Sequence, residues 1–450
     1  MRSPTPRDIE AQPRPARSSA SLNSTASTLA ATGTPTFDSK AFAHPLPPTP
    51  FSAVSSDLFT RHGLPSSPLP PKNGPRLYRY LRWNFGSVYR RLFAIVYLAN
   101  IAAMTVLAAS RITSGDPRSF TRDDAATAAT ANVLLAILVR NEHVVNALFR
   151  MVCNPWMRGL PLRARTLAAK VYSYGGIHSG GAVAATSWYV AFVVLLTIDW
   201  TKEDRDPGVL RGYVYLASYL VLVLLVCMLI SAHPSIRRAM HNWFEGIHRF
   251  MGWLAVILLW AQLLLLAADA GMSQGATSSF GEALVRSPTF WMLIAITLLI
   301  IYPWTRLRLR EVHAEVLSGH CLKLTFRNTG FKVDYGQAFR ITDAPLRETH
   351  AFGVIPLPSS AETAHHCPGC TCTRTPALLG EKQAPVMDQT SGQSTDFSLL
   401  IAKAGDWTSN LIANPPRRLY TRGVPQFGVL RIAGLFSPVV VVATGRIRRP

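Results

Sequence analysis

Histidines within an otherwise apolar sequence are the residues whose chemistry first calls for an explanation. Five of the twelve histidines lie in or next to long apolar segments: His143, His178, His233, His241 and His248. Ionisable groups at membrane depth are costly and are therefore candidates for function. Imidazoles that face each other from two helices can supply both axial nitrogens of a b-type haem, and His178 with His248 is the candidate pair. The alternative is that each histidine lies at the headgroup boundary and hydrogen-bonds to phosphate or water.

A second polar group interrupts the apolar sequence LVRNEHVVN. It contains Arg140, Glu142 and His143, which bring both signs of charge and an imidazole into one short stretch. Such a patch could line the path of a small-molecule carrier. No inverted repeat is apparent, so a carrier ranks below the other interpretations.

The elements that must position these residues are six apolar stretches. They cover residues 92–110, 125–152, 182–198, 212–232, 250–268 and 289–304. A helix needs about 20 apolar residues to cross roughly 30 Å of hydrocarbon. Mean hydropathy is +0.17 and only 16% of residues are charged, which is unusual for a soluble enzyme. We therefore predict a multi-pass α-helical membrane domain of six helices over residues 72–311.

The charge of the chain is strongly positive, with 46 Lys and Arg against 25 Asp and Glu, a net of +21. Seventeen of the basic residues lie in the segments on one side of the six stretches, against seven on the other side. Basic loops stay in the cytosol, so both termini are predicted to be cytoplasmic, with the plasma membrane favoured over an organelle. The lipid bilayer is the expected partner, and nucleic-acid binding is not needed to explain the charge. Residues 1–71 are rich in Ser, Thr, Ala and Pro and are predicted to form a disordered cytosolic tail.

After the long apolar runs, residues 312–450 contain segments in which apolar and polar residues alternate. HAEVLSGHCLKLTFR predicts two strands joined by a Ser-Gly turn, and GQAFRITD predicts another. The pattern favours a small, partial antiparallel β-barrel. An insert at about 359–396 separates two of its strands and contains Cys367, Cys370 and Cys372 next to two histidines. These are zinc-ligand types, but all lie within eight residues and no second pair follows, so an unstructured loop is the favoured interpretation.

Five motifs then carry a family resemblance: GGIHSGGAVAATSW, HNWFEGIHRFMGW, ETHAFGVIP, AGDWT and VVVVATG. Together they resemble the fungal TmpA-type integral membrane flavoproteins, distant relatives of ferric reductases and NADPH oxidases. The domain of that family also occurs fused to adenylate-forming synthetases. The resemblance implies a ferric-reductase-like membrane domain followed by an FAD-binding barrel of the ferredoxin-reductase type. It also implies FAD contacts from His350, Phe352, Thr408, Arg422 and Gly423.

The chain departs from this family in two respects. Two-haem relatives carry a second histidine about 13–14 residues along each ligating helix, where this chain has Ala191, Phe192, Ala261 and Gln262. At most one haem is therefore expected. The family's nicotinamide domain begins at VVVVATG, but only Gly445–Pro450 follow, so NAD(P)H binding by this chain alone is not expected and a partner protein would supply the missing reductase half.

These observations lead to one functional prediction and one alternative. The first is an FAD-linked transmembrane oxidoreductase of ferric-reductase-like, TmpA type, or a truncated and inactive version of one. The alternative is a non-enzymatic membrane regulator or partner-binding subunit. The residues do not identify an electron acceptor, a substrate or a catalytic group.

Overall fold

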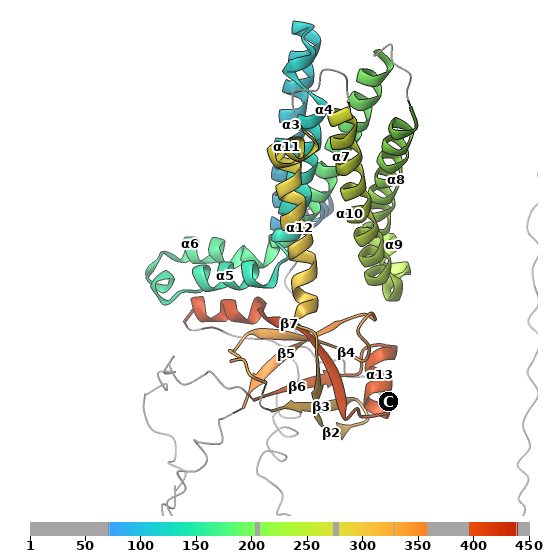
Figure 1. The fold of residues 1–450 in the computed structure, drawn as a ribbon. Coiled ribbons are helices and arrows are strands. Elements are labelled where there is room, and N and C mark those ends of the chain that lie inside the picture. Colours follow the sequence, from blue (N-terminus) through green and yellow to red (C-terminus); the bar gives the residue numbers. More distant parts are fainter. Residues whose placement is uncertain are drawn as a thin grey trace, which may run out of the picture. The chain divides into compact units, whose positions relative to one another are not determined.

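The computed structural model describes residues 71, 73–202, 208–272, 279–327, 329–357, 396–437 and 439. The described part of Gly74–Pro450 belongs to one compact unit, in which a group of long helices is followed by a β-sheet (Figure 1). The helices are α2 (Arg76–Asn84), α3 (Val88–Ser114), α4 (Arg122–Leu138), α5 (Glu142–Val152), α6 (Leu162–Ala168), α7 (Gly175–Lys202), α8 (Gly208–Ala232), α9 (Pro234–Ala239), α10 (His241–Met272), α11 (Phe280–Arg286) and α12 (Pro288–Thr305).

Several of these helices have the length and composition of membrane spans. Within the described ranges, five stretches qualify: Val88–Ser114, Leu162–Lys202, Val209–Ala232, Trp243–Gly271 and Pro288–Thr305. They coincide with five of the six predicted stretches. The end of the helices that adjoins the sheet is called here the sheet-proximal end, and it contains the start of α7 and α10. The opposite, sheet-distal end contains the start of α4 and α12.

The remaining predicted stretch, residues 125–152, is not one continuous helix. The structure divides it into α4 and α5, separated at Arg140 and Asn141. Asn141 causes the break because its side-chain oxygen accepts hydrogen bonds from the backbone N–H groups of His143 and Val144, at 3.0 and 3.4 Å, and so caps a new helix. Figure 1 shows α5 leaving the direction of the long helices. The polar patch therefore lies at a helix junction and does not interrupt a span.

Apolar packing holds the long helices together. Phe192, Leu196, Val214 and Val221 are almost completely buried in one cluster between α4, α7, α8 and α10. At the sheet-distal end the helices are tied by ion pairs, among them Arg111 with Asp199 at 2.8 Å. Many other apolar side chains of these helices are exposed, as expected for helices that face lipid.

The sheet has seven strands: β1 (Arg308–Glu311), β2 (His313–Ser318), β3 (Cys321–Phe326), β4 (Gln337–Thr342), β5 (His350–Pro356), β6 (Phe397–Ala402) and β7 (Arg418–Phe427). Its order is β1-β7-β4-β5-β6-β3-β2, every pairing is antiparallel, and the sheet is curled. Alternate residues of β3 and β7 are buried, as the period of two in the sequence predicts. A helical part followed by a partial antiparallel barrel is thus confirmed.

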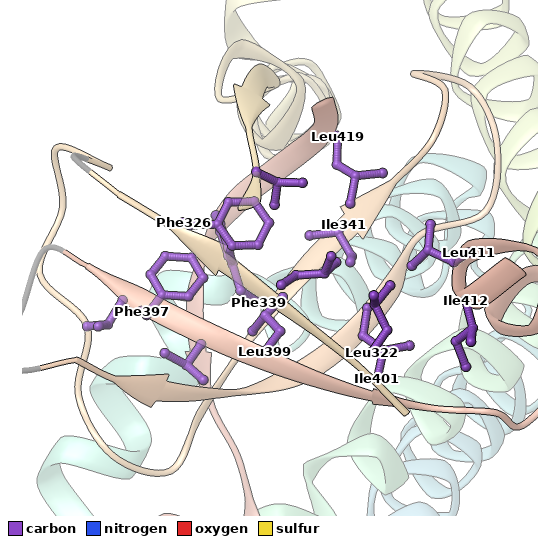
Figure 2. Packing of buried hydrophobic residues seen from close by; sticks show 14 residues of the cluster. Leu322, Phe326, Phe339, Ile341, Phe397, Leu399, Ile401, Leu411, Ile412 and Leu419 are labelled. Carbon is purple, nitrogen blue, oxygen red and sulfur yellow. The ribbon is translucent and has the colours of Figure 1, made fainter. Parts of the chain in front are cut away.

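The interior of the curled sheet is filled by aromatic and branched side chains (Figure 2). Phe397 is central, because its ring lies 5.0 Å from Phe326 and 5.7 Å from Phe339, measured between ring centroids. Helix α13 (Asp406–Ala413) covers one edge of this core with Leu411 and Ile412. The predicted insert at about 359–396 and the apolar run VVVVATG lie almost entirely outside the described residues.

Candidate functional site

The predicted histidine pair is brought together. His178 on α7 and His248 on α10 face each other with ring centroids 6.5 Å apart and planes inclined by 62°. Both side chains lie at the sheet-proximal end of the long helices. The two residues are 70 positions apart in sequence, so the juxtaposition is a product of the tertiary fold.

The surroundings of the pair fix one tautomer. The Nδ1 atom of His178 lies 2.8 Å from the carbonyl oxygen of Ala136 on α4. A carbonyl only accepts, so Nδ1 carries the proton and Nε2 is left with a lone pair. On the other side, the Nδ1 atom of His248 is buried and has no hydrogen-bond partner among the described residues, and its ring stacks on Phe244 at 5.5 Å.

The helix that carries His178 is held in place by close packing. Gly180 lies where a Cβ atom would come within 2.8 Å of the Phe93 carbonyl oxygen and 3.1 Å of the Val96 side chain. Only glycine allows α3 and α7 to approach this closely. The glycines that flank His178 in GGIHSGG therefore position the imidazole by setting the distance between two helices.

The donor set of the pair fits an axially ligated metal. The two imidazoles would hold the iron of a single haem between them, because their ring centroids are 6.5 Å apart and metal–imidazole bonds are about 2 Å long. A protonated Nδ1 that donates to a carbonyl is the usual outer-shell support of a metal-bound histidine. The residues present thus fit the axial ligation of a single haem.

The other histidines near the helices have different environments. The Nε2 atom of His143 lies 2.8 Å from the Tyr302 hydroxyl on α12. The Nδ1 atom of His233 accepts from the backbone N–H of Ser235 at 3.4 Å and caps α9. The side chain of His241 lies outside the described residues. Among the described side chains, neither His143 nor His233 faces a second imidazole.

The predicted FAD contacts on β5 lie against a tryptophan. His350 stacks on Trp407 with centroids 4.2 Å apart, and Phe352 lies 6.2 Å from the same ring. Trp407 belongs to the AGDWT motif, although the sequence analysis assigned no role to its ring. An aromatic residue inside a short motif that follows a strand is the signal that would have pointed to it.

Thr408 is used by the backbone of its own turn. Its hydroxyl oxygen accepts from the N–H groups of Ala404 and Gly405 at 2.8 and 3.0 Å, and the hydroxyl donates to the Gly405 carbonyl. Thr408 is buried and stabilises the start of α13. These hydrogen bonds give Thr408 a structural role, and its predicted contact with a cofactor stays a prediction.

Gly423 serves the contact between sheet and helices. Its φ is +74°, and a Cβ atom there would collide with the carboxylate of Glu142. That carboxylate is buried, accepts from the backbone N–H of Val424 at 2.8 Å and pairs with Arg340 at 2.6 Å. A glycine in the left-handed region thus admits a buried acid, for which the sequence analysis gave a carrier path only as its lowest-ranked interpretation.

Asn146 completes this contact one helical turn further along α5. Its side-chain amide donates to the Pro425 carbonyl and accepts from the Phe427 N–H, each at 2.8 Å, as a neighbouring strand would. Glu142 and Asn146 are four residues apart and therefore lie on one face of the helix. This face of α5, bonded to β7, is called the α5–β7 joint below.

Arg422 lies between the sheet and the end of α12. Its guanidinium is 4.8 Å from the Trp304 ring centroid, and Nη2 is 3.4 Å from the Thr349 hydroxyl. Burial, followed by repulsion from Arg249 and Arg340, lowers the pKa of Arg422 to about 10. The arginine expected at a cofactor diphosphate is thus packed against helix α12.

Two polar groups inside the helices were not predicted. Asn100 accepts from Asn132 at 2.7 Å and from the Trp188 indole at 2.8 Å. In the second group, Tyr189 donates to Gln262 at 2.9 Å, and Gln262 donates to Ser218 at 2.6 Å. Amides within apolar runs are the signal that identifies such groups.

The three cysteines of the insert, Cys367, Cys370 and Cys372, lie outside the described residues. Within the part of the chain that the structure describes, no cluster of three or more His, Cys, Asp or Glu side chains could hold a metal ion.

Comparisons with known proteins give two relatives from the fungus Coprinopsis cinerea. The chain is 34% identical to adenylate-forming reductase 06235 over 394 residues, which is 88% of this chain and 34% of that protein. It is 34% identical to adenylate-forming reductase 03009 over 384 residues, 84% of this chain and 32% of that protein. The chain thus spans about a third of the length of the curated relatives it matches. No protein-family model matches it.

These relatives correct the functional prediction. Both are named adenylate-forming reductases. The prediction of a ferric-reductase-like, FAD-linked membrane oxidoreductase is therefore wrong, and so is its alternative, a non-enzymatic regulator or partner-binding subunit. The descriptions TmpA-like, ferric-reductase-like and FAD-binding, which followed from the same resemblance, are corrected by the same finding. The names of these relatives agree with one attribute of the family that the motifs resemble, namely that its domain occurs fused to adenylate-forming synthetases.

Proposed function

We propose that this chain is the membrane-embedded module of an adenylate-forming reductase-type protein and holds that protein at a lipid bilayer. One observation supports this most: the matched region of 394 residues is too long to avoid the stretch from Val88 to Thr305, where the five membrane-length helices lie. Similarity to the relatives therefore extends through the helices. Adenylate formation and reduction are then supplied by the part of the protein outside this region, or by a partner.

The charge of the chain supports an orientation for the module. Among the described residues, sixteen Lys and Arg residues lie in the segments at the sheet-proximal end, against six at the sheet-distal end. The sheet and both termini then lie in the cytosol, where ATP for adenylate formation is available. In this arrangement the α5–β7 joint transmits the position of the membrane helices to the sheet.

A chimera tests the anchoring function. In adenylate-forming reductase 06235, the region matched by this chain is deleted or replaced by this chain, and acid-dependent ATP–pyrophosphate exchange is measured in membrane and soluble fractions. We expect the activity to leave the membrane fraction on deletion and to return on replacement. Activity that remains in the membrane after deletion would contradict the proposal.

Cysteine labelling tests the orientation separately. With the native cysteines replaced by serine, a membrane-impermeant maleimide should label Ser114→Cys in intact cells and Ser318→Cys only after permeabilisation. Both positions are exposed, one at the end of α3 and the other at the end of β2. The reverse pattern would overturn the orientation and leave the anchoring function untouched.

The histidine pair favours a second function, the binding of one b-type haem. The supporting observation is that His178 and His248 face each other at 6.5 Å while a carbonyl holds the proton of His178 on Nδ1. A haem supplies one-electron transfer when bound. The chain contributes the two imidazoles and the helix spacing that keeps them opposed.

Absorption spectra test the haem directly. Protein purified in mild detergent from haem-supplemented cells should show a Soret band that shifts on reduction with dithionite. His178→Ala and His248→Ala should each abolish the band. The matched control is His143→Ala, which removes an imidazole bonded to Tyr302 and should retain it. A band that persists in both single variants, or that is lost equally in the control, would sink the haem assignment.

A further inference from the structure

The sheet-distal half of the helices contains a cavity that neither proposed function uses. Its volume is about 330 Å³, and it lies between α4, α7, α10, α11 and α12. This volume is within the range of about 300–1,000 Å³ typical of small-molecule sites. Along α4 the lining runs from Arg122 to Thr130, eight residues and therefore about 12 Å of helix.

The floor of the cavity is polar but internally satisfied. Tyr189 and Gln262 line it, and both are bonded within the chain that runs from Tyr189 through Gln262 to Ser218. The Ser218 hydroxyl donates onward to the Val214 carbonyl at 2.7 Å. Because these groups satisfy one another, the floor does not require a polar ligand.

The walls are apolar. Phe192, Leu259, Leu263, Leu266 and Leu293 face the cavity from three different helices. Alanines on α4 and α10 leave the space that larger residues would fill, among them Ala126 and Ala267. An occupant of this shaft is therefore hydrophobic over most of its length.

Two arginines line the mouth, and each has a carboxylate within ion-pair distance. Arg122 and Arg286 line it together with one acid, Asp123, whose nearest carboxylate oxygen is 4.0 Å from Arg122 Nε and so too far for a hydrogen bond. Arg286 is paired with Glu282 at 2.6 Å but remains largely exposed. Within the described residues, Arg122 thus keeps donors available to a ligand.

The first turn of α12 adds to this field. Ser287 precedes α12 and lines the mouth, and its side chain does not cap the helix; Pro288 has no N–H and the Phe290 N–H donates to the Ser287 carbonyl at 3.1 Å, so of the first three residues only Thr289 has an N–H left for a ligand. Free N–H groups at a helix start favour an anion. Two guanidinium groups, with their acid partners, and the N–H of Thr289 therefore surround the opening of an apolar shaft.

We propose that the sheet-distal cavity binds one amphipathic carboxylic acid. The carboxylate lies at Arg122 and Arg286, beside the start of α12, and the hydrophobic body extends along the shaft toward Tyr189 and Gln262. The proposal stands on the cavity alone and does not depend on the adenylate-forming or haem assignments.

Photolabelling with a diazirine analogue of decanoate tests the proposal on the full chain in lipid nanodiscs. Labelled peptides should come from α4, α10 and α12. Unlabelled decanoate should suppress the labelling, whereas decan-1-ol and decyltrimethylammonium should compete at least about tenfold more weakly, because they lack the carboxylate that forms charge-assisted hydrogen bonds. Equal competition by decan-1-ol would overturn the carboxylate and leave a site for lipid tails.

Variants locate the site. Arg122→Gln combined with Arg286→Gln should weaken labelling by about tenfold or more. Ala267→Trp should abolish it by filling the shaft, and Leu263→Phe provides a milder version should that variant not fold. The matched controls are Arg118→Gln, an exposed arginine in the neighbouring turn, and Ala103→Trp on the exposed face of α3. Labelling that is unchanged in the arginine and shaft variants, or that falls equally in the controls, would refute the site.

Discussion

The sheet-proximal and sheet-distal halves of the helical part bury polar groups in different ways. At the sheet-proximal end, Glu142 and Asn146 bond to the backbone and side chains of another element, and the α5–β7 joint results. At the sheet-distal end, Tyr189, Gln262 and Ser218 bond to one another beneath a cavity, and the Ser218 hydroxyl also donates to the Val214 carbonyl of its own helix. Polar groups thus connect two layers in the first half and line a compartment in the second.

This difference predicts which substitutions of polar residues should lower the stability of the protein most. A polar group that bonds across two elements leaves charged or backbone partners unsatisfied when it is removed. A group that bonds within one cluster loses fewer contacts. The predictions below test this order, from the largest expected effect to the smallest.

The largest effect is expected for Gly423→Ala. The substitution forces a side chain into positive φ and against the Glu142 carboxylate, which should destabilise the fold by about 3–5 kcal/mol and loosen the sheet from α5. Thermal unfolding and limited proteolysis between helices and sheet measure this. Gly353→Ala is the control, because a Cβ atom at Gly353 meets nothing within 4 Å. Equal stability of the two variants would contradict the joint.

Asn146→Ala should have the next largest effect. It removes two buried hydrogen bonds to β7 and leaves a backbone N–H and a carbonyl without partners, at a cost of about 2–4 kcal/mol. Asn84→Ala, which removes one exposed bond to the Tyr80 carbonyl, should change the unfolding midpoint little. A midpoint in Asn146→Ala that matches the control would show that α5 docks through apolar contacts alone.

Gln262→Leu should be milder, about 1–3 kcal/mol, because the volume is kept while the Tyr189 hydroxyl loses its acceptor. Thermal unfolding of the purified protein provides the measurement. Ser218→Ala removes the last hydroxyl of the hydrogen-bonded series from Tyr189 through Gln262 to Ser218, and it should lower the free energy of unfolding less than Gln262→Leu does. If Gln262→Leu destabilised the protein more than Asn146→Ala, the expected order of the sheet-proximal and sheet-distal halves would be contradicted.

The smallest effect concerns the pH dependence at Arg422. Its folded pKa is about 10 and its ordinary value 12.5, so the unfolded state holds the proton more tightly. The unfavourable burial of the cation is fully present at neutral pH and is relieved as the pH rises through about 10. Relative to Arg422→Met, the wild-type unfolding midpoint should therefore rise by about 1–2 °C between pH 8 and 10.5. Arg347→Met, at an exposed arginine, should show no such trend. If the difference in unfolding midpoint between the wild type and Arg422→Met did not change with pH, a lowered pKa of Arg422 would be contradicted.

Much of the fold could be predicted from local pattern. Five long apolar runs became helices of membrane length, and HAEVLSGHCLKLTFR formed β2 and β3 around a turn. The failure at residues 125–152 is instructive, because the prediction gave more weight to the apolar residues of this stretch than to its polar patch, and the chain breaks there, at residues 139–141. Asn141 caps α5, and Val145 and Phe149 of α5 pack against Phe427 of β7, a contact that the local sequence does not reveal.

The candidate site was predicted less well. His178 and His248 were paired correctly because few histidines lie near the helices, but the hydrogen bond that fixes the tautomer comes from Ala136 on a third helix. Thr408 and Gly423 were selected from motifs, and their hydrogen bonds and backbone angle serve the fold. A motif shows that residue types are required at given spacings, and it does not show what they contact.

The sequence by itself determined which segments are long and apolar, which alternate, and where charge gathers, since these depend on neighbours within one or two turns. The tertiary structure decided which polar groups meet. Glu142 and Arg340 are 198 residues apart, and the cavity takes its lining from five helices. The rotation and depth of each helix set such contacts, and these follow from packing over the whole unit, so local sequence cannot specify them.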